Sequence, residues 1–71
     1  MSPDKLVMMA NQIGAFFASQ GPQGADGVAD HIRSFWDPRM RAGIFDHLDN
    51  KGGEGLSPIV VQALESLRPK P

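Results

Sequence analysis

Two histidines are the first candidates for chemistry in this chain of 71 residues. His31 and His47 lie in segments whose patterns predict two different helices. Imidazole binds metal ions and transfers protons near neutral pH, but a metal site needs further ligands around it. By helical phase, each ring lies at the edge of an apolar stripe, which favours a histidine bonded to a backbone or carboxylate group. We therefore predict neither metal binding nor proton transfer at these two residues.

The other groupings that catalysis requires are missing from the sequence. The chain has no Cys, which excludes a thiol nucleophile and cysteine-based zinc sites. It has no Gly-x-Ser-x-Gly string and no glycine-rich phosphate loop after a strand. Residues 46–54 are acidic and glycine-rich, like a calcium-binding loop. Counted from Asp49, however, Lys51 and Gly53 occupy positions that need oxygen ligands. We predict no catalytic, cofactor-binding or metal-binding residue.

Arginine and aromatic residues gather in one short run, residues 33–41. The run holds three of the seven basic residues and the only Trp, on both sides of a predicted helix break at Pro38. Such a combination suits stacking and phosphate pairing on a single-stranded nucleic acid. The net charge of −1 argues against this use, because binding that neutralises many phosphates leaves a basic excess. A small nucleic-acid-binding regulator is therefore the weakest function considered, and we expect no nucleic acid as a partner.

A protein partner explains the same residues better. Trp, Met and Arg are enriched in protein interfaces. A chain of this length buries only about 60% of the surface that its unfolded form exposes, so external support is expected. The residues also allow another explanation, in which Arg41 covers the core with its aliphatic stem and Trp36 belongs to the core. The predicted partner-binding residues are Arg33, Trp36, Arg39 and Arg41, with Met8, Met9 and Phe16 as a second patch.

The uncharged segment from Leu6 to Ala25 raises the question of a membrane. Its apolar part ends at Ala18, is interrupted by Asn11 and Gln12, and is shorter than the roughly 20 residues that a spanning helix needs. A signal peptide is disfavoured, since its cleavage would leave too little chain for a stable core. We expect no membrane association and a cytoplasmic location.

Prolines that follow a capping residue mark three helix starts. Ser2-Pro3, Asp37-Pro38 and Ser57-Pro58 each combine a capping side chain with a proline suited to the first helical position. A turn rich in glycine and proline, residues 20–26, contains the remaining start. The chain is therefore predicted to be one all-α domain, residues 1–71, built as a small bundle of about four short helices. The expected helices span residues 3–19, 23–36, 38–50 and 58–68, followed by a frayed tail at 69–71.

Apolar residues recur at helical spacing in each expected helix rather than alternating as in a strand. The stripe of each helix should therefore face one common core. In chain order, the stripes consist of Leu6, Ala10, Ile13 and Phe17; Val28, Ile32, Phe35 and Trp36; Met40, Ile44 and Leu48; and Ile59, Ala63, Leu64 and Leu67.

Several strings together resemble the delta subunit of soluble NAD-dependent formate dehydrogenase, over nearly the whole chain from Ser2 to about Leu67. A string as specific as Phe-Trp-Asp-Pro-Arg-Met in so small a protein, in the same order as Met-Ala-Asn-Gln-Ile, makes a chance match improbable. The strings are Ser2-Pro3-Asp4-Lys5-Leu6-Val7, Met9-Ala10-Asn11-Gln12-Ile13, Phe16-Phe17, Ala29-Asp30-His31-Ile32, Phe35-Trp36-Asp37-Pro38-Arg39-Met40-Arg41 and Gly53-Glu54-Gly55-Leu56.

The resemblance implies a cytoplasmic complex that oxidises formate to carbon dioxide and reduces NAD. In this family the alpha subunit carries bis-molybdopterin guanine dinucleotide, with molybdenum or tungsten, and iron–sulfur clusters. The beta and gamma subunits carry FMN, further clusters and the NAD site. The resemblance places no cofactor ligand on this chain.

For this chain the resemblance implies a non-catalytic accessory subunit. We expect it to dock as a helical wedge on a larger subunit and to stabilise the assembled or cofactor-loaded form. The alpha subunit is the expected partner, in preference to beta or gamma. The alternative is a transient assembly chaperone that helps to insert the molybdenum cofactor into the alpha subunit and then leaves.

Overall fold

The computed structural model describes residues 2–68, which form four α-helices and no strand. The predicted all-α class is confirmed. The predicted tail at 69–71 lies outside the described residues. The helices are α1 (Pro3–Ala18), α2 (Gly24–Phe35), α3 (Pro38–Asn50) and α4 (Pro58–Leu67), with one short 3-10 turn, η1 (Gly21–Gln23), before α2. None of these helices is long and apolar enough to cross a membrane.

The helix starts follow the local chemistry of their caps, with one exception. The Ser2 hydroxyl accepts a hydrogen bond from the Lys5 amide at 3.3 Å, and the Asp37 carboxylate accepts one from the Met40 amide at 2.8 Å. Each bond satisfies an N–H group that has no partner inside its helix. Ser57 was expected to cap α4 in the same way, and this expectation is wrong. Its hydroxyl oxygen is buried and bonds to nothing in residues 2–68.

Asn11 instead fixes the residues just before α4. Its Nδ2 donates to the carbonyl oxygen of Gly55 at 2.8 Å, and its Oδ1 accepts from the amide of Ser57 at 2.9 Å. One side chain on α1 thereby holds the connection to α4, in which Gly53 and Gly55 have positive φ angles of 70° and 85°. Glycine adopts such angles at little cost. The start of α4 is therefore fixed from a helix more than forty residues earlier in the chain.

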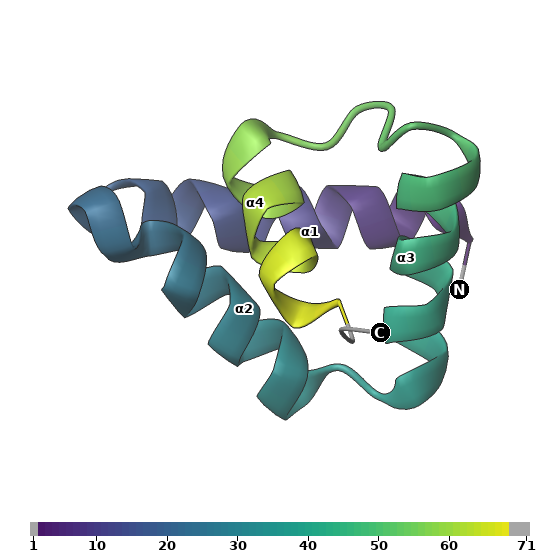
Figure 1. Ribbon diagram of the computed structural model, residues 1–71, viewed down its shortest axis with the longest axis horizontal. Coiled ribbons are helices and arrows are strands. Elements are labelled where there is room, and N and C mark those ends of the chain that lie inside the picture. The colour runs from purple at the N-terminus through teal and green to yellow at the C-terminus, as the bar shows by residue number, and fades with distance from the viewer. Residues whose placement is uncertain (1, 69–71) are drawn as a thin grey trace.

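Figure 1 shows how the four helices share one core. α1, α2 and α3 form three sides of a frame, and α4 lies across its middle. α4 packs mainly on α2, and α1 contacts each of the other three helices. The residues of the predicted apolar stripes belong to the core or pack against it, with the exception of Phe35.

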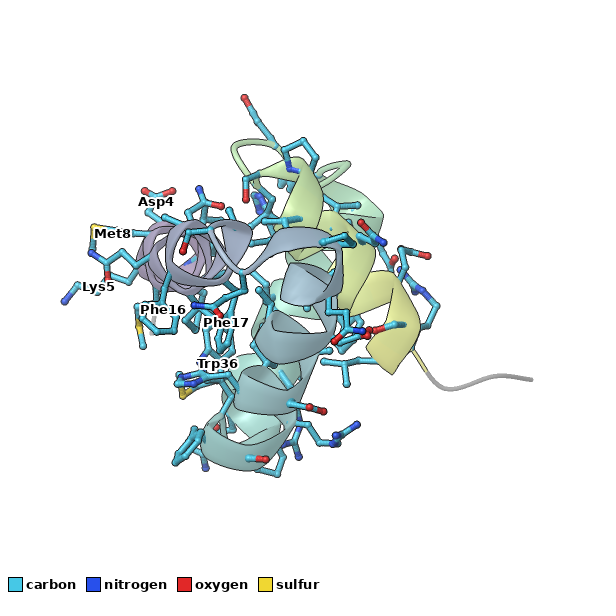
Figure 2. The ribbon with its side chains drawn as sticks, turned by 90° about the vertical axis from the view of Figure 1, so that its left-hand side faces the viewer. Asp4, Lys5, Met8, Phe16, Phe17 and Trp36 are labelled. Atoms are coloured by element: carbon cyan, nitrogen blue, oxygen red, sulfur yellow. The ribbon has the colours of Figure 1, made fainter. Side chains whose placement is uncertain are left out.

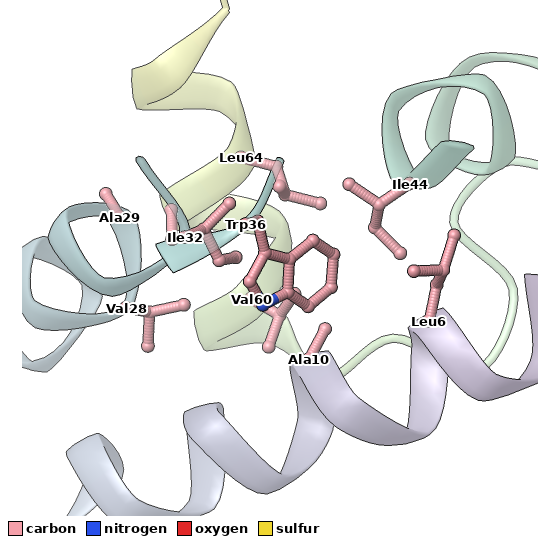
Figure 3. Close-up of a cluster of buried hydrophobic side chains, with 10 residues drawn as sticks. Leu6, Ala10, Val28, Ala29, Ile32, Trp36, Ile44, Val60 and Leu64 are labelled. Carbon is pink, nitrogen blue, oxygen red and sulfur yellow. The ribbon is translucent and has the colours of Figure 1, made fainter. Parts of the chain in front are cut away.

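The core is centred on the indole of Trp36 (Figure 3). The ring lies among side chains from three helices, with Leu6 and Ala10 of α1 on one side, Val60 and Leu64 of α4 on another, and Ile44 of α3 facing it. Trp36 itself has left α2, since its backbone is extended, with φ −87° and ψ 135°. This turn of the chain directs the ring into the space between the helices.

The last turn of α4 is tied to the end of α3 by Arg68. Its guanidinium donates two hydrogen bonds to the Asp49 carboxylate, at 2.8 and 3.1 Å, and a third to Glu65 at 3.0 Å. The same group lies over the ring of Phe45, 5.7 Å from the ring centroid. The hydrogen bond from Arg68 holds the pKa of Asp49 below its ordinary value, and the bond to Asp49 raises the pKa of Arg68. Arg68 therefore links the end of α4 to the end of α3.

The Arg68→Gln variant should melt at a lower temperature than the wild type at pH 7. The difference between the two melting temperatures should become smaller as the pH is lowered. Because the pKa of Asp49 is lower in the folded chain than in the unfolded chain, the ion pair stabilises the fold above about pH 4. That contribution is lost as the pH falls through the folded-state pKa. Melting temperatures from circular dichroism between pH 7 and pH 3 measure this difference.

The Arg33→Gln variant is the matched control for Arg68. Among residues 2–68, Arg33 forms an ion pair only with Asp30 on the same helix, and both side chains are exposed. Such pairs contribute little to stability. The melting temperature of Arg33→Gln should stay near that of the wild type. If the difference in melting temperature between the wild type and Arg68→Gln were the same at pH 3 as at pH 7, the role given to Asp49 would be contradicted.

Candidate functional site

Trp36 was predicted to contact a partner, but its side chain is only 4% exposed. The indole is part of the core described above, which leaves its ring with no surface to offer another protein. The backbone carbonyl of Trp36 is also engaged, since it accepts a hydrogen bond from Arg41. Of the two explanations that the sequence allows for this residue, the structure favours the core.

Arg41 joins the end of α2 to the beginning of α3. Its Nη1 atom donates to the carbonyl oxygen of Trp36 at 2.7 Å and to that of Arg33 at 3.1 Å. Carbonyl groups at the end of a helix lack partners within it, and a cation there also interacts favourably with the helix dipole. Arg41 is half-buried. Its position in the sequence is therefore explained by the α2–α3 junction without a partner.

The two other arginines of the run are exposed. Arg33 forms an ion pair with Asp30, while Arg39 forms neither an ion pair nor a hydrogen bond with any side chain of residues 2–68. Arg39 lines a shallow hollow together with Leu6 and Met40. Since two of the three arginines have partners within the chain, this run offers one uncommitted guanidinium rather than a basic patch. That observation further disfavours a nucleic-acid ligand.

The second predicted patch lies on the outer side of α1. Met8 is 55% exposed and Phe16 is 65% exposed, whereas Met9 is half-buried against the core. Figure 2 shows Met8 and Lys5 projecting from α1 away from the other helices, and Phe16 and Phe17 side by side below α1 in this view. The chain carries no charged residue between Leu6 and Ala25, so the outer side of α1 beyond Lys5 is uncharged.

Phe35 was assigned to the core stripe of the second helix, and this assignment is wrong. It is 75% exposed, more than Met8 or Phe16. Phe35 is the last residue of α2, at the end that lies away from α1 (Figure 1), and Trp36 takes the core position beside it. The buried residues of α2 are Gly24, Ala25, Val28, Ala29 and Ile32.

Phe35 and Phe16 border a groove between α1 and α2, which we call the aromatic groove and define by Phe16, Phe17, His31 and Phe35. Two shallow hollows share Phe17 and His31, one bounded by Phe16 and the other by Phe35. The rings of Phe16 and Phe17 meet edge to face with centroids 5.0 Å apart. The rings of His31 and Phe35 lie 4.8 Å apart at a tilt of 36°. Sequence reasoning found Phe16 but missed the groove, because its walls belong to different helices.

The aromatic groove suits the binding of apolar side chains rather than chemistry on a substrate. Its titratable neighbours are His31, stacked on Phe35, and Asp30, paired with Arg33. Within residues 2–68, no three His, Asp or Glu side chains come close enough together to hold a metal ion. The second histidine, His47, is 2.6 Å from the carbonyl oxygen of Glu54 and helps to hold the loop before α4. Both histidines thus have structural contacts.

Comparison with known proteins gives one match. The family model described as NADH-dependent formate dehydrogenase delta subunit FdsD matches residues 5–64. The matched range includes all four helices except the ends of α1 and α4, and it contains the aromatic groove. No curated protein and no solved structure matches the chain.

Proposed function

The chain belongs to the FdsD family, the delta subunits of NADH-dependent formate dehydrogenase, and from this membership we propose that it is a non-catalytic accessory subunit that docks on a larger subunit of the complex. The proposed partner is the alpha subunit, with beta and gamma in the same assembly. The cofactors, namely the molybdenum or tungsten pterin, the iron–sulfur clusters, FMN and NAD, are proposed to reside in those subunits. The complex is proposed to be cytoplasmic.

One observation supports docking above all. Met8, Phe16 and Phe35 are each more than half exposed, although the chain has a closed core with an indole at its centre. Single exposed apolar residues are ordinary, but large ones that gather on one surface mark an interaction site, and Phe16 and Phe35 border hollows that share Phe17 and His31. A larger subunit that covers these side chains would also support a domain with little stability of its own.

The proposed effect on the complex follows from mass action. A subunit that binds the assembled, cofactor-loaded form more tightly than the empty form stabilises the loaded form by its difference in affinity for the two. No residue of this chain has to touch formate or NAD for such an effect. The uncharged, apolar surface described above is suited to lasting contact with another subunit.

Complex purified without this chain should be less stable to heat and should contain less metal than the complete complex. At equal protein concentration, we expect a lower temperature of half-inactivation and a lower molybdenum or tungsten content per alpha subunit, because the loaded form is no longer favoured by binding. Metal analysis and thermal inactivation measure the two effects. Unchanged metal content, heat stability and turnover would contradict the proposal.

The same preparation separates a permanent subunit from a transient assembly chaperone. A permanent subunit stays at an equimolar ratio to alpha in the mature enzyme, as we expect here. A chaperone is found on the unloaded alpha subunit and is absent from the mature enzyme. Quantitative mass spectrometry of the purified complex gives the ratio.

A further inference from the structure

We propose that the aromatic groove receives the apolar face of an α-helix that a larger subunit of the complex supplies. This inference rests on the proposed function, since it names the contact through which the accessory subunit docks. It also moves the docking site from the arginine run to the space between α1 and α2.

The shape of the groove is set by the absence of a side chain at its base. A Cβ atom on Gly27 would lie 2.4 Å from Cδ1 of Phe17, so the Phe17 ring rests directly on the backbone of α2. The ring therefore forms a floor, while the exposed rings of Phe16 and Phe35 stand at the two borders. The hollow beside Phe16 has a volume of about 300 Å³, enough for apolar side chains to insert.

The secondary structure of the groove selects a helix as its occupant. Both walls are helices whose backbone N–H and C=O groups are bonded within α1 and α2, and residues 2–68 contain no strand to which an extended segment could add. An extended peptide would therefore gain no backbone hydrogen bonds from strand addition and would be held by side chains alone. A helix satisfies its backbone internally and presents only side chains, as in other helix-in-groove complexes.

Charge defines the chemistry of the contacting face. The outer side of α1 is uncharged from Met8 to its end, and the one acidic residue of the groove, Asp30, is already paired with Arg33. A charged side chain of the partner would lose its hydration here without gaining a counter-charge. The complementary surface is therefore apolar, and Gln12 and His31 offer the hydrogen-bonding groups for an isolated polar atom.

A larger subunit, rather than a second copy of this chain, is the proposed occupant. A twofold dimer would bring the exposed Phe35 of each copy toward the hollow of the other, and the crosslinking experiment below tests that arrangement. The chain also belongs to a family of subunits of a multi-subunit enzyme. The complex therefore contains other surfaces that can supply the inserted helix.

The test replaces both border residues in the chain as it is co-expressed with the other subunits. The Phe16→Glu and Phe35→Glu double variant should bind the complex about 100-fold more weakly, about tenfold for each lost anchor. The Phe16→Leu and Phe35→Leu double variant should bind much like the wild type. Since both residues are largely exposed, neither double variant should alter the melting temperature of the isolated chain by more than a few degrees.

Two further variants separate this surface from the rest of the chain. Gln62 is exposed on α4 and does not line the groove, so Gln62→Glu adds the same charge without touching the contact. Arg39→Glu tests the arginine run. Both variants should remain in the complex at the wild-type ratio. If the Arg39→Glu variant were missing from the complex while the Phe16→Glu and Phe35→Glu double variant remained in it, the inference would be overturned. The docking site would then lie at the arginine run, residues 33–41.

A photo-crosslinking residue at position 35 identifies the occupant directly. We expect crosslinks to a stretch of a larger subunit with apolar residues at spacings of three and four. Crosslinks to a second copy of this chain, or to a charged extended segment, would refute the inference. If the wild-type chain does not co-purify with the complex, the proposed function fails. If the wild-type chain co-purifies and the glutamate double variant binds equally well, only this inference fails.

Discussion

Replacing Trp36 by alanine is expected to reduce the free energy of unfolding by about 3–5 kcal/mol, which is most of the stability of a domain this small. The indole fills the centre of the core, where it contacts residues of α1, α3 and α4. Its removal leaves a cavity that the helices cannot close without moving toward one another. We expect the Trp36→Ala chain to be largely unfolded at 25 °C, as measured by far-ultraviolet circular dichroism and urea denaturation.

The neighbouring residue supplies the control for this prediction. Phe35→Ala also removes an aromatic ring, but from a side chain that is 75% exposed, so it should cost less than about 0.5 kcal/mol. Trp36 is the only Trp of the chain, so the fluorescence of the wild type and of Phe35→Ala reports on the same buried indole. Equal losses of stability in the two variants would contradict the placement of the two rings.

Replacing Asn11 by alanine is expected to cost about 1–3 kcal/mol. The change leaves the part-buried Ser57 amide without its partner, which costs about 1–3 kcal/mol, whereas water can replace the bond to the exposed Gly55 carbonyl. Hydrogen exchange should show faster exchange of the Ser57 amide, and urea denaturation should show the loss in unfolding free energy.

Two substitutions make the Asn11 prediction specific. Asn11→Asp can still accept from the Ser57 amide but cannot donate to the Gly55 carbonyl, so it should cost less than alanine. Gln12→Ala changes the next residue, which is exposed, and should cost less than about 0.5 kcal/mol. A Gln12 variant as unstable as the Asn11 variant would show that helix propensity, rather than the two long-range bonds, controls this position.

The Asn11 variants and the phenylalanine double variants separate the inner and outer sides of α1. Ala10 belongs to the core and Asn11 holds the loop before α4, while Phe16 borders the aromatic groove proposed for docking. Variants of the inner side should therefore lose folding and binding together. Variants of the outer side should lose binding alone, which keeps the proposed function testable in a folded chain.

The arginine run shows why a cluster in the sequence need not be a cluster of binding groups. Arg33, Arg39 and Arg41 lie close together in the chain because the α2–α3 junction does. Once the helices form, Arg33 pairs with Asp30 and Arg41 bonds to the last carbonyl groups of α2. Composition counts charges but does not tell which are already neutralised inside the fold.

The sequence by itself determined the class of the fold, the starts of three helices and the family. α1, α3 and α4 begin at Pro3, Pro38 and Pro58, the prolines from which their starts were predicted. The resemblance read from the strings is confirmed by the family match over residues 5–64. These features depend on groups within about four residues of one another, so they are visible without knowing where the rest of the chain lies.

The tertiary structure alone decided which of two adjacent aromatic rings is buried, what holds the loop before α4 and where the aromatic groove lies. Helical phase placed Phe35 and Trp36 on one stripe, but α2 ends between them and only Trp36 turns into the core. Asn11 reaches the loop before α4, and Phe17 rests on Gly27, only because helices distant in sequence pack together. Such contacts depend on the positions of whole helices, which no local pattern encodes.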